Sequence, residues 1–425
     1  MRVPFATACC ALAVIACAAA PNAGAAPIHD RGLTIQATPR RIIAGEAVLI
    51  YGRLRGPGNA GQTIRLYHRI APAPYFSLIG VTKTNADGQY EFARAEGIVL
   101  SNRSWFVRGP GLTHSRTVRE RVAALVSLGA STTGGLTRHA ITFSGHVTPD
   151  HTGGVVLLQQ QLGSGDDWRT IGRARIGASS DFSLSHAWRL PGSYDVRALL
   201  RADARNAAAP SDPVSVVIQQ AQAPGFTIQA ADQIVSTGQP VTISGTLDQP
   251  GTTTPEPNTS VGLFEALPGT GSFREVSTTT TGPDGSYSFA GVASAHSELY
   301  RVRTMFAPIR SSATLFEGVQ DALTIQASST TALVGGTVTF TGTVSPDKAG
   351  HAIYLQRLGA DGDWHTVQVR RVSSLSTFRF IWTFGAQGTK EFRARITGGR
   401  IEIGGASPTV TVDVSLPPLT TLPTG

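Results

Sequence analysis

A pattern of alternating apolar and polar residues that ends in glycine occurs four times along this chain. The four copies lie 93, 100 and 97 residues apart, at Gly52, Gly145, Gly245 and Gly342. Before each glycine, apolar residues take every second position, as Val338 and Phe340 do in the fourth copy. Such alternation is typical of a strand with one face on a core. The spacing therefore predicts four similar β-modules rather than one large core.

The surrounding residues extend each copy into a larger strand pattern. An opening strand lies nineteen residues before the glycine in three copies, as in Leu323-Thr324-Ile325, and a second apolar strand follows the glycine. The clearest copy is the stretch 338–364, which ends on Trp364 after an acidic turn. Asp-Gly pairs at 87–88 and 284–285 predict hairpins in the first and third copies.

Roughly seven short strand patterns in about 95 residues are typical of a two-sheet β-sandwich. We therefore predict an all-β chain of four tandem immunoglobulin-like sandwiches. The expected boundaries are 1–25 for a signal peptide, 32–123, 124–222, 223–320 and 321–416 for the sandwiches, and 417–425 for a disordered tail. The joints are short, as at residues 219–225, so an extended array with limited bending is expected.

The modules resemble known families in two ways. The second and fourth resemble the immunoglobulin-like domains of secreted actinobacterial proteins, through residues 144–149 (SGHVTP) and 341–346 (TGTVSP) and the later Trp168 and Trp364. The first and third resemble carboxypeptidase-regulatory or fibronectin-type sandwiches, through the Asp-Gly-x-Tyr-x-Phe hairpins at 87–92 and 284–289. These resemblances imply the fold and leave the function open, because such modules serve as spacers, adhesins and appendages of enzymes.

The N-terminus predicts export. Arg2 precedes an apolar run over residues 3–20, and the small residues 23–26 (AGAA) follow, which together are typical of a secretory signal peptide. Cleavage is expected after Ala25 or Ala26, so the run is not expected to span a membrane. We therefore expect a secreted, extracellular or cell-surface location.

An alternative is a lipid anchor at Cys17. Residues 14–17 (VIAC) resemble a lipobox, in which the cysteine is acylated and becomes the first mature residue. The chain has no cysteine other than Cys9, Cys10 and Cys17. A mature chain that starts at residue 26 would therefore contain no disulfide and no thiol nucleophile.

The charge of the chain is spread unevenly over the modules. The first module carries Lys83 and twelve arginines against five acidic residues, whereas the third, counted through Asp321, carries four arginines against nine acidic residues. The basic first module, with Arg40, Arg41, Arg53 and Arg55 as candidate contacts, could attract an anionic polymer, although solvated faces of opposite sign explain the same numbers. Nucleic acid is not an expected partner, because no basic run is interleaved with aromatic residues.

No residue pattern predicts an enzyme, a cofactor or a metal. His139 and His146 are seven residues apart, which places them on opposite faces of a regular strand, and surface positions are expected for the histidines. The acidic turns before Trp168 and Trp364 hold too few oxygens for Ca²⁺. Core packing is expected for both tryptophans, and a ligand contact is the alternative that keeps them as candidate site residues.

Two hypotheses follow for the function. The first is a secreted or envelope-exposed non-enzymatic protein with a structural, adhesion or spacer role. The second is a noncatalytic binding protein for a glycan or an anionic envelope polymer, with a cell-envelope polysaccharide or protein as the partner.

Overall fold

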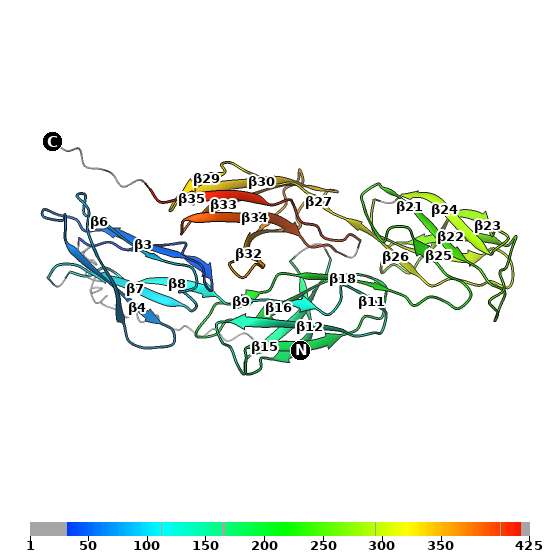
Figure 1. Ribbon diagram of the computed structural model, residues 1–425, viewed down its shortest axis with the longest axis horizontal. Helices are drawn as coiled ribbons and strands as arrows, with labels where there is room; N and C mark the ends of the chain where they lie inside the picture. Colours follow the sequence, from blue (N-terminus) through cyan, green and yellow to red (C-terminus); the bar gives the residue numbers. More distant parts are fainter. Residues whose placement is uncertain (1–31, 112, 164–165, 294, 400, 418–425) are drawn as a thin grey trace, which may run out of the picture.

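The computed structural model describes residues 32–111, 113–163, 166–293, 295–399 and 401–417. The predicted signal peptide, Cys17 and the tail from residue 418 lie outside these ranges. The described residues form strands and loops without a helix, and they include no helix that is long and apolar enough to cross a membrane. The all-β class and the tandem sandwiches are confirmed (Figure 1).

The first module consists of two facing sheets, β1-β3-β6 and β2-β8-β7-β4-β5, in which β2 runs parallel to β8. Its strands are β1 (Gln36–Thr38), β2 (Arg41–Ile43), β3 (Val48–Arg53), β4 (Thr63–Ile70), β5 (Ser77–Lys83), β6 (Gln89–Arg94), β7 (Arg103–Arg108) and β8 (Val118–Ala123). Apolar side chains at alternate positions, such as Ile50, Leu66 and Trp105, fill the space between the sheets.

The second module repeats this plan, with β10-β12-β15 facing β11-β18-β16-β13-β14. Its strands are β9 (Leu125–Val126), β10 (Gly129–Ala130), β11 (Gly134–Leu136), β12 (Ile141–Thr148), β13 (Val155–Gln161), β14 (Trp168–Arg175), β15 (Asp181–His186), β16 (Gly192–Leu200), β17 (Ala209–Pro210) and β18 (Val214–Gln219).

The third and fourth modules have the same strand order, with β19-β21-β24 facing β20-β26-β25-β22-β23 and β28-β30-β33 facing β29-β35-β34-β31-β32. The third contains β19 (Gln229–Ala230), β20 (Ile234–Ser236), β21 (Pro240–Thr246), β22 (Ser260–Ala266), β23 (Arg274–Thr280), β24 (Ser286–Ala293), β25 (Glu298–Thr304) and β26 (Leu315–Gln320). The fourth contains β27 (Ala322–Leu323), β28 (Gln326–Ala327), β29 (Thr331–Leu333), β30 (Thr337–Ser345), β31 (Ala352–Leu358), β32 (Trp364–Arg371), β33 (Thr377–Thr383), β34 (Gly388–Ile396) and β35 (Val410–Ser415).

The repeated glycine has a packing reason. In each module it lies where the opening strand crosses, so that an added Cβ would overlap the carbonyl oxygen of Thr34, Ser127, Thr227 or Thr324. The same Cβ would also meet an aromatic ring of the neighbouring strand in the same sheet, such as Tyr90 in the first module. The hydroxyl of Tyr90 donates to the oxygen of Thr34, and Tyr287 donates likewise to Thr227. Glycine is therefore required for the close approach of two backbones.

The modules do not form the extended array that the short joints predict. Figure 1 shows the fourth module folded back beside the second, with the first and third modules at the two ends. The reversal occurs at residues 219–225, where the side chain of Gln219 exchanges hydrogen bonds with the backbone of Phe316 in the third module, at 2.7 and 2.8 Å. A short joint can therefore set a sharp turn when its side chains bind the next module.

The outer faces of the large sheets of the second and fourth modules pack against each other. Strands β13 and β31 are consequently buried on both faces, and the outward-facing Gln356 is completely buried. Thr366 donates to Asp212 from its backbone nitrogen (3.1 Å) and from its hydroxyl (2.7 Å). Asp195 forms a hydrogen bond with the backbone of Gly398, and burial raises the pKa of Asp195 and of Asp212 above the usual range.

Two joints share one geometry. In the first joint, Ala207 of the second module lies parallel to Ala123 and donates to the oxygen of Val122 at 2.8 Å. In the third joint, Ile403 of the fourth module lies parallel to Gln320 and donates to the oxygen of Val319 at 2.8 Å. The chain is thus built from two similar pairs of modules, in each of which a loop of the later module extends the last sheet of the earlier one.

Candidate functional site

The two candidate tryptophans lie on the outer faces of their sheets rather than in the cores. The guanidinium of Arg197 stands 4.1 Å from the centre of the Trp168 ring, and that of Arg393 stands 4.4 Å from the centre of the Trp364 ring. Arg197 is also held by Gln159 at 3.0 Å, and Arg393 by Gln356 at 2.7 Å. Both rings are half-buried. The expectation of core packing is therefore wrong, and arginine covers a ring face in each case.

The histidines of the second module do not come together. His139 and His146 are exposed, and His146 pairs with Asp181 at 2.8 Å. His151 is buried, against the expectation of a surface position, and its Nε2 lies 3.4 Å from Asp203. Within the described ranges, no three His, Cys, Asp or Glu side chains are grouped closely enough to hold a metal ion.

The first and fourth modules meet through ion pairs. Arg357 lies 3.3 Å from Glu46 and 3.2 Å from Glu96, and Lys390 lies 2.8 Å from Glu96. Burial raises the pKa of Glu46 in spite of Arg357. Burial also acts on Glu96, but Lys390 and Arg357 outweigh it and lower the pKa of Glu96. We call these four residues the ionic clasp.

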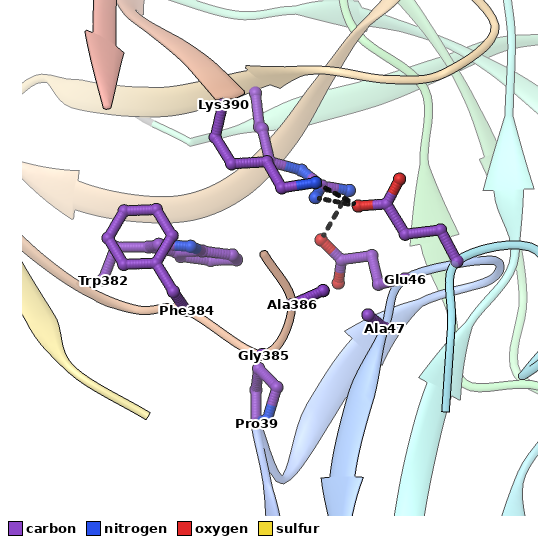
Figure 2. Close-up of a pocket in the computed structure, with 10 residues that line it drawn as sticks. Pro39, Glu46, Ala47, Trp382, Phe384, Gly385, Ala386 and Lys390 are labelled. Carbon is purple, nitrogen blue, oxygen red and sulfur yellow. Dashed lines mark hydrogen bonds and ion pairs between the residues drawn. The ribbon is translucent and has the colours of Figure 1, made fainter. Parts of the chain in front are cut away.

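Two hollows adjoin the ionic clasp. The smaller, of about 20 Å³, has room for about one water. Figure 2 shows Trp382 and Phe384 on one side of it and Glu46 and Lys390 on the other. The larger, of about 220 Å³, lies where the first, second and fourth modules meet. Its charged side chains pair with one another, as His365 does with Asp361 at 2.9 Å. Both hollows are therefore features of the joint between modules.

A different surface concentrates unpaired charge. The outer face of the sheet β2-β8-β7-β4-β5 in the first module carries arginines at alternate positions together with three aromatic rings. We call it the arginine–aromatic face and define it by Arg41, Arg65, Tyr67, Arg69, Phe76, Phe106, Arg108, Arg119 and Arg121. The inward positions of the same strands hold core residues such as Leu66 and Val107. The alternation of a half-buried sheet thus places every one of these arginines on the solvent side.

The rings of this face form one cluster that supports two guanidinium groups. Tyr67 and Phe106 are opposite each other in the ladder and stack with centres 4.8 Å apart, and Phe76 meets Phe106 edge-on at 4.9 Å. Arg108 lies 5.1 Å from the centre of Tyr67, and Arg69 lies 5.1 Å from the centre of Phe76. Stacking on a ring restricts an arginine while leaving its N–H groups open to a ligand.

The face has no compensating negative charge. Glu120 is the one acidic residue among the five strands, and it points into the core with 1% of its surface exposed. Among the described residues, none of the six arginines of the face forms an ion pair. Arg65 is directly opposite Arg108 in the ladder, and Arg41 is opposite Arg121. Like charges in opposite positions destabilise a sheet.

The four arginines that the sequence singled out are only partly on this face. Arg41 lies on its edge strand, and Arg40 lies in the adjacent turn. Arg53 belongs to the opposite sheet, where its Nε donates to the oxygen of Asp87 at 2.8 Å, and Arg55 follows it. The period-two spacing of Arg65, Tyr67 and Arg69 was the signal that could have located the face.

Comparison with known proteins leaves the family open. No protein-family model matches the chain, and no curated protein matches it. Among solved structures, Escherichia coli alpha-2-macroglobulin activated by porcine elastase is similar at 13% identity over 90% of this chain and 44% of its own, with a TM-score of 0.23. The chain thus spans less than half the length of that protein.

Two bacterial proteins are similar to the same degree. Invasin, a bacterial integrin-binding protein, is 13% identical over 90% of this chain and 79% of its own, with a TM-score of 0.23. The Escherichia coli adhesin FdeC is 14% identical over 69% of this chain and 96% of its own, with a TM-score of 0.24. At these values the likenesses carry no argument about activity or partners.

Proposed function

We propose that this chain is an exported, non-enzymatic protein with a structural or adhesion role, in which a packed pair of modules supports the first module. The observation that carries the proposal is the burial of the outer sheet faces of the second and fourth modules against each other. A spacer would keep such faces solvated. Here Asp212 and Asp195 bind Thr366 and Gly398 across the contact, which fixes the modules relative to one another.

The chemistry of the described residues supports a role without catalysis. The charged groups at the joints form ion pairs with one another, as in the ionic clasp. The buried Lys348 likewise lies between Asp321 (3.1 Å) and Glu402 (2.9 Å). A catalytic site needs a nucleophile or an acid–base pair that faces a substrate. These groups instead join modules, which favours a scaffold.

The proposal is tested by locating the protein and its target. A C-terminally tagged chain is expressed in its native host, the cells are fractionated and shaved with protease, and the purified protein is mixed with isolated cell envelope. We expect protease-accessible tag outside the membrane and retention on the envelope without a change in the size of the envelope polymers. Protein that stays inside the cell, or polymer that becomes shorter, would overturn the proposal.

A second candidate function is a noncatalytic binding protein for an acidic glycan. The arginine–aromatic face favours it, because its five strands carry six arginines on this face, while their one acidic residue, Glu120, points into the core.

A further inference from the structure

The arginines of the arginine–aromatic face are arranged in rows that cross the strands. Arg65 and Arg108 form one row, Tyr67 and Phe106 form the next, and Arg69 and Arg119 flank Ser104 in the third. Arg65 and Arg69 are four residues apart on one strand, which corresponds to about 13 Å. A row of aromatic rings therefore separates two rows of positive charge.

This arrangement suits a ligand that carries repeated negative charges on a ring-containing chain. A guanidinium binds carboxylate, sulfate or phosphate through paired N–H donors. Arg108 is already placed over Tyr67, so less side-chain entropy is lost when it binds an anion. The rings between the charged rows offer an apolar surface on which a sugar ring can lie.

A second copy of the chain does not fit this face. The equivalent faces of the second and fourth modules pair because acidic residues such as Asp212 and Asp195 oppose the arginines Arg393 and Arg395. Two arginine–aromatic faces would bring arginines against arginines with no acidic residue between them, which costs energy. The complementary partner must bring the negative charge itself.

We propose that the arginine–aromatic face is a binding site for an acidic polysaccharide, with Arg65, Arg69, Arg108 and Arg119 binding the anionic groups and Tyr67 and Phe106 contacting the sugar rings. The proposal deepens the function proposed above and depends on it in one respect, namely that the exported protein meets such a polymer. Because Arg65 and Arg108 are like charges directly opposite each other in the ladder, their mutual contact does not favour folding. Their presence is explained by a ligand rather than by folding.

The test measures binding of the purified chain from residue 26 to four immobilised polymers. Heparin and polygalacturonate are the acidic polysaccharides, poly-glutamate is an acidic polymer without sugar, and dextran is a neutral one. We expect binding to both acidic polysaccharides that weakens with salt, no binding to dextran, and at least tenfold weaker binding to poly-glutamate. Equal affinity for poly-glutamate and the acidic polysaccharides would overturn the glycan assignment in favour of an acidic protein.

Two variants and a matched control locate the site. R65A/R108A should weaken binding to both acidic polysaccharides about tenfold. R53A/R55A, which removes the same charge at and just beyond the end of β3 in the opposite sheet, should change it less than about twofold. F106L should weaken binding to the polysaccharides about threefold and leave binding to poly-glutamate unchanged. Equal losses in R65A/R108A and R53A/R55A would show attraction to net charge alone and would overturn the site.

A stability measurement separates a binding role from a structural one. Because R65A removes the repulsion and keeps the stacking of Arg108 on Tyr67, its thermal midpoint should equal or exceed that of the unchanged chain. A lower midpoint would show that Arg65 serves folding, against the proposal. The two proposals fail separately: a protein found inside the cell removes the proposed role but not the site, and an exported protein that binds neither acidic polysaccharide removes the site alone.

Discussion

Gly145 has no room for a side chain, which makes it a sensitive test of the repeated fold. An added Cβ would overlap the carbonyl oxygen of Ser127 and approach the ring of Phe182. We predict that G145A destabilises the second module by about 3 kcal/mol in urea unfolding, because two backbones must separate. G134A is the control, since Gly134 in β11 has open space around its Cβ position. Equal effects of the two substitutions would contradict the packing reason.

Two carboxyl groups at equivalent positions in the first and third modules make the stability of these modules depend on pH. Glu120 in β8 and Glu317 in β26 are buried, and neither side chain has a hydrogen-bond partner among the described residues. Burial, with a contribution from Glu46 at Glu120 and from Asp232 at Glu317, raises the pKa of each to about 8. Both stay protonated in the folded chain at pH values at which the unfolded chain has lost the proton. Their contribution to stability is therefore present below about pH 4.5 and is lost as the pH rises through about 8.

We predict that E120Q/E317Q reduces this dependence, because glutamine has no proton to lose. Between pH 5 and pH 8 the urea midpoint of the unchanged chain should fall more steeply than that of the variant. At pH 8 the variant should be more stable by a few kcal/mol, on the order expected for pKa shifts of this size. Circular dichroism follows the transition, and E91Q, at an exposed position, is the control. Parallel curves for the variant and the unchanged chain would contradict the prediction.

Residue patterns predict which side of a strand faces a core, but they do not predict what covers the other side. The alternation at Val338 and Phe340 correctly placed both in the core of the fourth module. On β13, Leu157, Gln159 and Gln161 alternate with core residues in the way expected of a solvated face, yet all three are buried. Polar outer faces are compatible with water and with a hydrogen-bonded partner, so sequence alone could not distinguish these cases.

At the scale of elements, the two similar joints differ at one equivalent position, which is Lys348 in the fourth module and His151 in the second. The backbone nitrogen of Lys348 donates to Ser376 at 3.1 Å, as that of His151 donates to Ser180 at 3.0 Å. Lys348, with 2% of its side chain exposed, binds Asp321 and Glu402, and burial raises the pKa of Asp321 to about 7 although Lys348 acts to lower it. The joint thus depends on a buried cation between two carboxyl groups.

We predict that K348M loosens the third joint. Removing one member of a buried ionic group costs about 3–5 kcal/mol, because the remaining charges lose their partner. Hydrogen exchange should then become faster at the amide of Ile403, which donates to Val319 across the joint. K83M, at an exposed position on an edge strand, is the control and should change neither the exchange rate nor the melting temperature. Unchanged protection of Ile403 in K348M would count against the role given to Lys348.

The loops that form the joints could not be predicted from the sequence. The strands around them follow from alternation and from Asp-Gly turns. The loop that carries Ile403, in contrast, is rich in glycine and has no periodicity. Its role follows from the contacts of Ile403, which packs with Phe316 and Leu299 of the third module and near Val217 of the second. A single apolar residue among glycines carries too little pattern to predict a contact among three modules.

At the scale of the whole molecule, the folded-back arrangement joins parts of the chain that are about 300 residues apart, as Glu96 and Lys390 are at 2.8 Å. Two contacts between modules act one after the other. They are the packed faces of the second and fourth modules and the ionic clasp. The first fixes the fourth module, and the clasp then fixes the first module against it. The orientation of the arginine–aromatic face therefore depends on contacts that short joints alone would not supply.

This dependence predicts that the ionic clasp restrains the first module. Because the chain has no cysteine after Cys17, cysteines introduced at the exposed positions Glu91 and Arg379 can carry spin labels without interference. Pulsed electron resonance should give one narrow distance distribution for the labelled chain at low salt. R357A/K390A should broaden it, since partly buried ion pairs of about 1 kcal/mol each are lost. R370A/R371A removes the same charge from an exposed part of the fourth module and should leave the distribution narrow. A broad distribution in the unchanged chain would mean that the first module is free, and a narrow one in R357A/K390A would mean that the joint with the second module alone is sufficient to hold it.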